Sequence, residues 1–347
     1  MNHVRYAVAG GGAIAQRRHL PEAHAYPKSS IVAVCDPLEE RVKGVADHYN
    51  ARPFVDFDDM LAKADCDAVV VATPNADHAP QTIKALEAGK HVLVEKPMAT
   101  NSADAKAMIA ASEKSGKFLM VGMNQRLMPP HVKAREILDT GKIGKIITFE
   151  TNFKHGGPDN WSLDGASSWF FKKDRAVLGV NGDLGIHKAD LMRFLLDDEF
   201  ATVGGFVKTL SKTTPDGKLI PVDDNAFLEL ETKTGIVGSI HISWTNFGRF
   251  GDNGTALFGE KGVMRIGMDD TYGVMVDLAD GSKERYIVGA MATNEKQTAS
   301  GIVDSFTECI LSNTPPTIDG SEGYKALQVI LTAVDAAEQG KFLDIEY

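Results

Sequence analysis

Three residues, Lys96, Asp183 and His187, are of the types that move a proton during hydride transfer. Lys96 stands in a Glu-Lys-Pro segment directly after a short apolar run, where an ammonium can stabilise a substrate oxygen as its hydroxyl loses a proton. Asp183 and His187 are four residues apart, which places both side chains on one face of a helix. A neutral imidazole can accept the hydroxyl proton, while the carboxylate can bind a hydroxyl or orient the ring. The alternatives are a surface lysine paired with a glutamate and a histidine satisfied by packing.

A metal centre is not predicted around these residues. No third ligand lies at a suitable local spacing from the carboxylate–histidine pair, and His155 would have to arrive from a loop. The three cysteines, Cys35, Cys66 and Cys309, are odd in number and far apart, which disfavours a zinc site and a disulfide framework. We therefore expect buried free thiols, as in a cytoplasmic protein.

A glycine-rich segment near the start of the chain predicts dinucleotide binding. The sequence GGGAIA at 10–15 fits G-x-G-x-x-A between a predicted strand and a predicted helix. Gly10 permits the tight turn, and Gly12 lets the backbone approach the pyrophosphate. The start of the helix, at Ala13 and Ile14, directs N–H donors at the phosphates. The alternative is a glycine-rich turn that binds no ligand.

The carboxylate at the end of the second predicted strand indicates which dinucleotide binds. Asp36 can accept hydrogen bonds from the adenosine ribose hydroxyls and repels a 2′-phosphate. No arginine or serine follows it immediately, so NAD is predicted in preference to NADP. Arg41, about one helical turn further on, leaves NADP as the alternative. Asp36 can also be the N-cap of the following helix, and the two roles are compatible.

The first third of the chain alternates short β-branched runs with amphipathic segments, which predicts a doubly wound parallel sheet. Some of the runs are apolar without alternation, as expected for strands that helices cover on both faces. The predicted strands are 4–9, 31–35, 68–72, 91–94 and 118–121, and the predicted helices are 13–25, 38–49, 77–88 and 102–114. We therefore predict an α/β protein whose N-terminal Rossmann domain spans 1–123.

After about residue 122 the pattern changes to alternating apolar and polar residues, which is typical of an antiparallel sheet with one covered face. The predicted strands are 146–153, 203–210, 226–231, 237–245, 255–258 and 274–277, with helices at 131–138, 301–311 and 323–339. We predict that 124–347 form an α+β substrate-binding domain on a large open, mostly antiparallel sheet. Because an open sheet has to cover its second face, we expect a homodimer or homotetramer through this sheet.

Composition narrows the classes of function. The net charge of −10 argues against a nucleic-acid surface. No apolar run approaches the roughly 20 residues that a membrane span requires. The N-terminus passes directly into a predicted strand, which leaves no room for a signal peptide. We expect a two-domain cytoplasmic enzyme or binding protein with no nucleic-acid or membrane partner.

Taken together, these segments resemble the Gfo/Idh/MocA family, which includes glucose–fructose oxidoreductase and inositol 2-dehydrogenase. The resemblance covers nearly the whole chain, and its most specific part is the run AGKHVLVEKP at 88–97. It implies that Lys96, Asp183 and His187 line the substrate site beside the nicotinamide, with the histidine as the usual acid/base. It also implies cofactor contacts at Thr73, Pro74, Asn75, His78, Glu95, Lys96, Gln125 and Arg126.

Two departures from the family pattern leave the substrate open. Many members carry a triple glycine before the aspartate helix, whereas this chain has GVNG at 179–182, and WFFKK at 169–173 replaces the more usual Trp-Arg. His155, Trp161 and Trp169 are predicted to line the substrate pocket, because aromatic faces suit the C–H faces of a sugar. The alternative is that the tryptophans fill the domain interface.

The predicted activity is hydride transfer between NAD and a secondary hydroxyl of a sugar, glycoside or cyclitol. One alternative is a glycoside-cleaving or epimerising enzyme that reduces and reoxidises its own NAD in place. Reduction of a ketone or imine in the physiological direction is another. A third, from a different class, is a non-catalytic dinucleotide-sensing protein. The lysine, aspartate and histidine argue against the sensor, since it needs no proton transfer.

Overall fold

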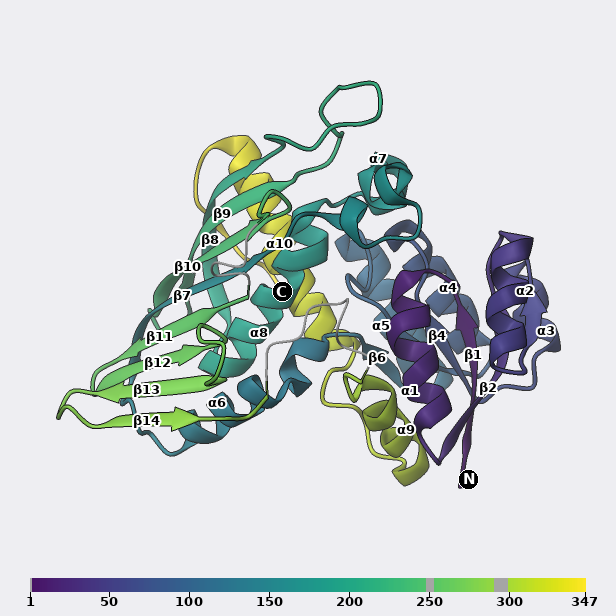
Figure 1. Cartoon of the computed structure of the whole chain (residues 1–347), viewed down its shortest axis with the longest axis horizontal. Coiled ribbons are helices and arrows are strands. Elements are labelled where there is room, and N and C mark those ends of the chain that lie inside the picture. Colours follow the sequence, from purple (N-terminus) through teal and green to yellow (C-terminus); the bar gives the residue numbers. More distant parts are fainter. Residues whose placement is uncertain (1, 248–252, 290–298) are drawn as a thin grey trace. The chain divides into compact units, whose positions relative to one another are not determined.

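The computed structural model describes residues 2–247, 253–289 and 299–347, and contacts among them divide the chain into two compact units (Figure 1). The first unit contains 2–124, 161–163 and 299–324. The second contains 125–160, 164–247, 253–289 and 325–347. Helix α9 (Ile302–Ser312), late in the sequence, thus joins the first unit and packs on its first and fifth strands.

A six-stranded parallel sheet is the core of the first unit, with the strand order β3-β2-β1-β4-β5-β6. The order reverses between β1 and β4, and doubly wound sheets bind ligands at the carboxyl edge of such a reversal. This confirms the predicted Rossmann sheet. The strands are β1 (Val4–Ala9), β2 (Ser29–Cys35), β3 (Arg52–Phe54), β4 (Ala68–Val71), β5 (His91–Val94) and β6 (Leu119–Val121).

Two helices of the first unit, α3 and α5, begin at residues whose side chains satisfy a free N–H group. Asp56 Oδ1 accepts the N–H of Asp59 at 2.9 Å, and Asn101 Oδ1 accepts that of Asp104 at 2.9 Å. The one helix predicted over 13–25 is instead a π-helical turn, η1, followed by α1. The elements are η1 (Ala15–His19), α1 (Leu20–Ala25), α2 (Glu39–His48), α3 (Phe57–Lys63), α4 (Asn75–Glu87) and α5 (Ser102–Ser115).

The second unit is built on a nine-stranded sheet in the order β14-β13-β12-β11-β7-β10-β9-β8-β15. Only β7 and β10 pair in parallel among these strands, so the mostly antiparallel open sheet is confirmed. The strands are β7 (Ile146–Lys154), β8 (Phe200–Lys208), β9 (Asn225–Thr232), β10 (Val237–Ser243), β11 (Thr255–Gly259), β12 (Gly262–Ile266), β13 (Val274–Leu278), β14 (Lys283–Tyr286) and β15 (Leu343–Asp344).

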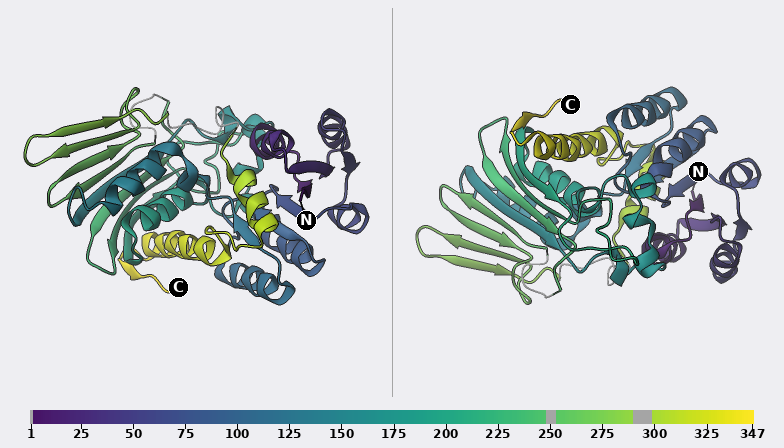
Figure 2. Two further views of the ribbon diagram at one scale, coloured as in Figure 1. Left: turned by 90° about the horizontal axis from the view of Figure 1, so that it is seen from below. Right: turned by 90° about the horizontal axis from the view of Figure 1, so that it is seen from above.

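Helices lie along one face of this sheet. Figure 2 shows α6, α8 and residues 325–339 of α10 on the same side of the curved strands. The helical elements are η2 (Asn124–Leu127), α6 (Pro129–Asp139), η3 (Pro158–Asn160), η4 (Gly165–Ser167), η5 (Trp169–Phe171), α7 (Lys173–Ala176), η6 (Asn181–Gly185), α8 (Ile186–Leu196) and α10 (Gly320–Gln339). None of the helices in the described ranges is both long and apolar enough to cross a membrane.

The opposite face of the sheet exposes large apolar side chains. β9 alternates buried and exposed residues, which leaves Phe227 outward, stacked on His241 with ring centroids 3.8 Å apart. Hollows on this face are lined by aromatic rings together with polar groups of β9 and β10. The exposed apolar residues on this face are Phe206 of β8, Phe227 of β9, Val237 of β10 and Phe342 just before β15.

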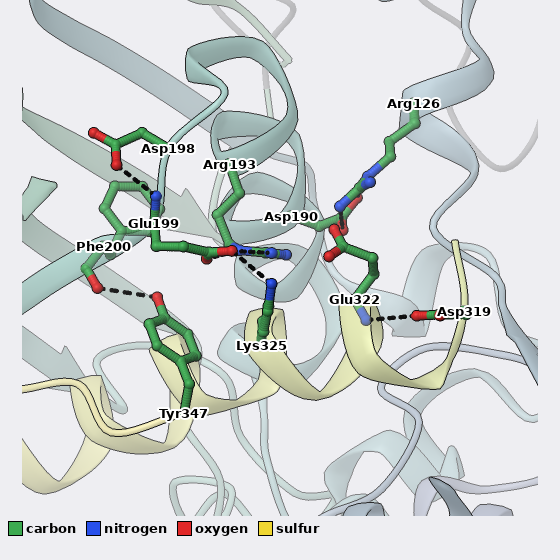
Figure 3. A network of polar contacts seen from close by, with 10 residues as sticks. All are labelled: Arg126, Asp190, Arg193, Asp198, Glu199, Phe200, Asp319, Glu322, Lys325 and Tyr347. Atoms are coloured by element: carbon green, nitrogen blue, oxygen red, sulfur yellow. Dashed lines mark hydrogen bonds and ion pairs between the residues drawn. The ribbon is translucent and has the colours of Figure 1, made fainter. Parts of the chain in front are cut away.

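A polar network within the second unit fixes α8 (Figure 3). Glu199 accepts hydrogen bonds from Arg193 at 2.6 Å and from Lys325 of α10 at 2.9 Å. Burial opposes ionisation of Glu199, but these two cations prevail and lower its pKa to about 2. The network therefore ties the end of α8 to α10.

Candidate active site

The glycine-rich turn leaves β1 at the carboxyl edge of the parallel sheet. Gly10 has φ 94°, and a Cβ there would lie 2.4 Å from the carbonyl oxygen of Ala72, so the position requires glycine. A Cβ on Gly12 would meet no heavy atom within 4 Å, which leaves room beside the turn for a ligand. Ala13 and Ile14 begin the helical turn that continues into η1. The turn thus fits a dinucleotide pyrophosphate, and the phosphate contacts themselves stay a prediction.

Asp36 is held against this turn. Its Oδ2 accepts the N–H of Gly11 at 3.0 Å, and its Oδ1 accepts that of Leu38 at 3.0 Å. The N-cap of α2 is Leu38, so Asp36 precedes the helix rather than capping it. Nη1 of Arg41 lies 3.7 Å from Asp36 Oδ2. The carboxylate and this guanidinium are therefore neighbours at the predicted ribose position.

The residues that follow β4 form a tightly bonded corner. His78 of α4 has Nδ1 2.8 Å from the carbonyl oxygen of Pro97 and Nε2 2.8 Å from that of Thr73. The Thr73 hydroxyl donates to Gln81 Oε1 at 2.9 Å. His78 thus joins the loop after β4, which holds Thr73 and Pro74 and leads to Asn75 at the start of α4, to the loop after β5. The cofactor contacts predicted for these residues stay predictions.

Glu95 and Lys96 end β5 at the same edge of the sheet. The Lys96–Pro97 peptide is cis. Glu95 Oε1 accepts a hydrogen bond from His19 Nε2 at 2.7 Å, and Arg18 Nη1 lies 3.6 Å away. Lys96 is only partly buried, whereas Glu95 is buried. The strand therefore delivers a partly accessible amine next to a buried, paired carboxylate.

Asp183 and His187 lie in the second unit, at the junction of η6 and α8. They are 2 % and 4 % exposed. Trp244, directly after β10, donates from Nε1 to Asp183 Oδ2 at 3.0 Å. The carboxylate is thus fixed in one orientation by a fully buried indole, which the sequence did not single out.

His155 joins this cluster, and its predicted contact with substrate stays a prediction. Its Nδ1 accepts the N–H of Gly157 at 2.9 Å, so the proton of the neutral ring lies on Nε2. Nε2 is 3.7 Å from Asp183 Oδ2. The ring of Phe153 contacts both histidines, with its centroid 6.1 Å from that of His155 and 6.1 Å from that of His187. Two imidazoles and one carboxylate therefore gather at the end of β7.

The unusual GVNG segment forms the entry to η6. Asp223 accepts the N–H groups of Gly179 at 3.0 Å and Asn181 at 2.8 Å. A Cβ on Gly179 would lie 2.0 Å from the carbonyl oxygen of Asp223, so only glycine fits there. A Cβ on Gly182 would lie 2.7 Å from Leu178 Cβ. Close packing thus accounts for the first and last glycines, while Val180 and Asn181 are accommodated between them.

The two tryptophans of the predicted pocket fall in different units. Trp161 is buried and belongs to the first unit. Trp169, in the second, stacks on Phe170 with centroids 3.9 Å apart, and Phe170 in turn packs edge-on against Trp244 at 6.3 Å. Trp169 is thereby linked to the Asp183 cluster, and substrate contacts of both tryptophans stay predictions.

Gln125 and Arg126 lie in η2 of the second unit. Arg126 forms a two-pronged ion pair with Asp190 of α8, at 2.8 Å from Nε and 2.6 Å from Nη2 (Figure 3). The backbone oxygen of Gln125 accepts a hydrogen bond from His131 Nδ1 at 2.7 Å. These contacts fix η2 against α8 and α6, and the predicted cofactor contacts of both residues stay predictions.

Lys188, which the sequence did not single out, is fully buried directly after His187. Its Nζ donates no hydrogen bond to any described residue and lies 5.9 Å from the centroid of Phe153. Burial lowers its pKa to about 7. His131 nearby is neutral, because burial and Lys188 lower its pKa to about 3. Only its sequence position beside His187 could have pointed to it.

Each unit therefore brings together its own group of the residues predicted for the site. The first gathers the glycine turn, Asp36, Glu95 and Lys96 at the carboxyl edge of its sheet, and the second gathers Asp183 with the two imidazoles. Among the residues that the structure describes, no group of three or more His, Cys, Asp or Glu side chains could hold a metal ion.

Comparison with known proteins identifies the chain's relatives. Residues 4–123 match the family described as "Oxidoreductase family, NAD-binding Rossmann fold" (GFO_IDH_MocA), and residues 131–265 match the "GFO/IDH/MocA C-terminal domain". Scyllo-inositol 2-dehydrogenase (NAD(+)) of Bacillus subtilis is 27% identical over 348 residues, covering 98% of this chain and 96% of that protein. Levoglucosan dehydrogenase of Pseudarthrobacter phenanthrenivorans is 32% identical over 213 residues, 56% of this chain and 53% of that one.

A solved structure shares the whole architecture. The aldose-aldose oxidoreductase from Caulobacter crescentus, complexed with glycerol, aligns with a TM-score of 0.84 and 26% identity over 99% of this chain and 100% of that one. The family matches together span more than half of the chain. The chain therefore belongs to the Gfo/Idh/MocA family of oxidoreductases.

Proposed function

We propose that the chain is an NAD-dependent dehydrogenase that acts on a secondary hydroxyl of a sugar, glycoside or cyclitol. The observation that carries this proposal is the Asp183 cluster, in which a buried carboxylate held by Trp244 stands one helical turn before a buried histidine. Such a pair positions a hydroxyl and removes its proton. Relatives named for oxidising or reducing inositols, levoglucosan and 1,5-anhydro-D-fructose support this substrate class.

The proposed mechanism assigns a separate role to each residue of the site. His187 takes the hydroxyl proton, Lys96 stabilises the same oxygen, and Asp183 orients substrate or imidazole. A bound NAD would supply the hydride acceptor for the carbon that carries this hydroxyl. Trp244 keeps the Asp183 carboxylate from turning, because its N–H occupies Oδ2. His155 presents its Nε2 proton beside the same carboxylate and can donate to a second substrate hydroxyl.

NAD rather than NADP is the proposed cofactor. Asp36 accepts hydrogen bonds from the N–H groups of Gly11 and Leu38, which fix its negative charge beside the glycine turn. In doubly wound folds an acidic residue at this position binds the ribose 2′-hydroxyl and disfavours a 2′-phosphate, which supports the proposal. The nearby guanidinium of Arg41 is 3.7 Å from this carboxylate and is partly neutralised by it.

We also propose that the open face of the nine-stranded sheet joins copies of this chain into a homodimer or homotetramer. The exposed Phe206, Phe227 and Phe342 there form an apolar surface that association would remove from water. A cytoplasmic location is proposed from the three free thiols, and fractionation of the cells that make the protein tests it.

The activity is tested by mixing the protein and NAD with each member of a panel of inositols, aldoses, aldonates and glycosides and following nicotinamide absorbance over time. Continuous NADH formation with one compound supports the dehydrogenase. A burst that stops at one NADH per active site, with substrate still consumed, supports internally recycled NAD instead. Binding of NAD with no consumption of any compound favours the sensor.

A further inference from the structure

Lys212 lies in the long connection between β8 and β9, residues 209–224, and its amine binds a loop elsewhere in the second unit. Its Nζ donates hydrogen bonds to the backbone oxygen of Gly156 and to both carboxylate oxygens of Asp159, the latter at 2.7 and 2.8 Å. Lys212 is only 8 % exposed, which is unusual for a lysine in a largely exposed connection. Because a cation buried this deeply has to be paired, these acceptors explain how the fold tolerates it.

The backbone that carries Lys212 is fixed by a buried carboxylate. Asp224, which is 0 % exposed, accepts the N–H groups of the three successive residues 210–212 at distances between 2.7 and 2.8 Å. Its backbone oxygen also accepts the N–H of Trp244 at 2.8 Å, and Trp244 is the residue whose indole binds Asp183. The connection therefore directs the Lys212 side chain from a fixed point that is itself bonded to the Asp183 cluster.

The contacts of Lys212 fall on the loop 155–160. Gly157 in this loop has φ 101°, and a Cβ there would lie 2.7 Å from Lys212 Cε and 2.6 Å from Asp159 Oδ1. The stem of the lysine is thus packed directly on the Gly157 backbone, a close approach that requires glycine. Lys212 therefore holds this loop both by its amine and by its stem.

The same loop fixes the ring of His155. The N–H of Gly157 donates to Nδ1 at 2.9 Å, which leaves the proton of the neutral ring on Nε2. This Nε2 is buried, donates no hydrogen bond to any residue that the structure describes, and lies 3.7 Å from Asp183 Oδ2. The backbone N–H of His155 is bonded separately, to the oxygen of Ser243 at 3.0 Å. The conformation of the loop thus selects the tautomer of His155, while the backbone of His155 is anchored elsewhere.

We propose that Lys212 is a positioning residue that holds the loop 155–160 so that Gly157 binds Nδ1 of His155 and the Nε2 proton is available to a substrate hydroxyl. The inference rests on the proposed function for the role of His155 at that hydroxyl. Lys212 acts through the loop and has no contact of its own with the substrate. Its loss weakens substrate binding through His155, whereas the glycine turn predicted to bind NAD lies in the other unit.

The tautomer of His155 is the first readout, because it needs no substrate. Labelling the histidine rings with 15N reports the tautomer of each of the ten histidines by NMR, and His155→Phe assigns the His155 signals. At about pH 9, where an ordinary imidazole is neutral, we expect the shift difference between the two ring nitrogens of His155 to shrink in Lys212→Met, because both tautomers become populated. Lys218→Met removes a lysine of the same connection that is 83% exposed, and this control should leave the signals unchanged.

A double-mutant cycle gives the second readout. With the best compound of the panel, we expect Lys212→Met to raise the KM for substrate about 10-fold and to change the KM for NAD less than about 3-fold. In the His155→Phe background, Lys212→Met should change the KM for substrate less than about 2-fold, because the residue through which it acts is gone. Effects that multiply, or wild-type His155 signals in Lys212→Met, would overturn the proposal. If no compound yields NADH but the His155 signals change, the proposed function fails while the positioning of His155 by Lys212 stands.

A double variant guards against loss of folding. Lys212→Met leaves Asp159 without its counter-charge, although the Asp159 side chain is 29% exposed and water can hydrate it. Lys212→Met combined with Asp159→Asn removes both charges of the pair and still lacks the amine that binds Gly156. The same change of the His155 signals is expected in this variant, and wild-type signals in the folded double variant would refute the positioning role.

Discussion

Lys188→Met is the substitution for which the structure gives the most definite stability prediction. Lys188 is fully buried, donates no hydrogen bond to any residue in the described ranges, and has a pKa lowered by burial from 10.5 to about 7. Methionine has a similar length and no charge to desolvate, and Phe153 already offers it an aromatic neighbour. We therefore expect the variant to unfold at a higher urea concentration than the wild type at neutral pH.

The pH dependence follows from the direction of the shift. Between about pH 7 and about pH 10.5 the unfolded chain holds a proton on Lys188 that the folded chain has released, so wild-type stability rises with pH in this window. Over this whole window, the difference between the pKa values of Lys188 in the unfolded and folded chain corresponds to about 5 kcal/mol in the free energy of unfolding, at about 1.4 kcal/mol per pH unit. Between about pH 7.5 and about pH 9 the wild type should gain about 2 kcal/mol relative to Lys188→Met.

Urea unfolding of both proteins at the two pH values, followed by circular dichroism, measures this change. The difference in the free energy of unfolding between the two proteins cancels the contributions of all other titrating groups, because these groups are the same in both. Lys208→Met, on an exposed position of β8, is the control, because its ammonium stays in water. If the wild type and Lys188→Met changed in parallel between the two pH values, Lys188 would be charged and paired in the folded protein, and the reasoning would be refuted.

Three further predictions concern the site, the cofactor and the assembly. Trp244→Phe removes the N–H that Asp183 accepts at 3.0 Å, and we expect kcat to fall about 10-fold with unchanged NADH affinity in a fluorescence titration; an unchanged kcat would contradict this. Asp36→Ser is expected to raise the kcat/KM ratio of NADP to NAD about 10-fold or more, and an unaltered ratio would remove Asp36 from cofactor choice. Phe206 is 67% exposed on the open sheet face, and we expect the Phe206→Lys variant to form a smaller species than the wild type in light scattering. A monomeric wild type would disprove the interface.

Much of the fold could be predicted from the sequence, because the residue patterns that indicate strands and helices are local. The apolar strands 69–71 and 92–94, separated by amphipathic helices, required a covered parallel sheet, and the structure confirms it. The alternation in 226–231 likewise predicted one buried face of the second sheet. Short elements were missed: α3 has seven residues, β3 three and β15 two, which is too few for a period to emerge.

The site was predictable only where a residue's type and its place in a motif coincide. Lys96, Asp183 and His187 stand in recognisable segments, and Gly10 needs the positive φ that the motif implies. Trp244 is 61 residues from the carboxylate it binds, and no spacing rule links two side chains through a sheet. Lys188 is unusual only because it is buried without a partner among the described residues, and burial of a lysine cannot be read from its neighbours in sequence.

The central claim is that His187 removes the proton of a secondary hydroxyl while NAD takes the hydride. The most direct test compares continuous NADH formation by the wild type and by His187→Ala with the best compound of the panel, alongside NAD binding by both. We predict that the variant binds NAD as the wild type does and turns over about 100-fold more slowly or worse. Equal turnover in the two proteins would contradict the account, because the buried histidine would then have no part in the reaction.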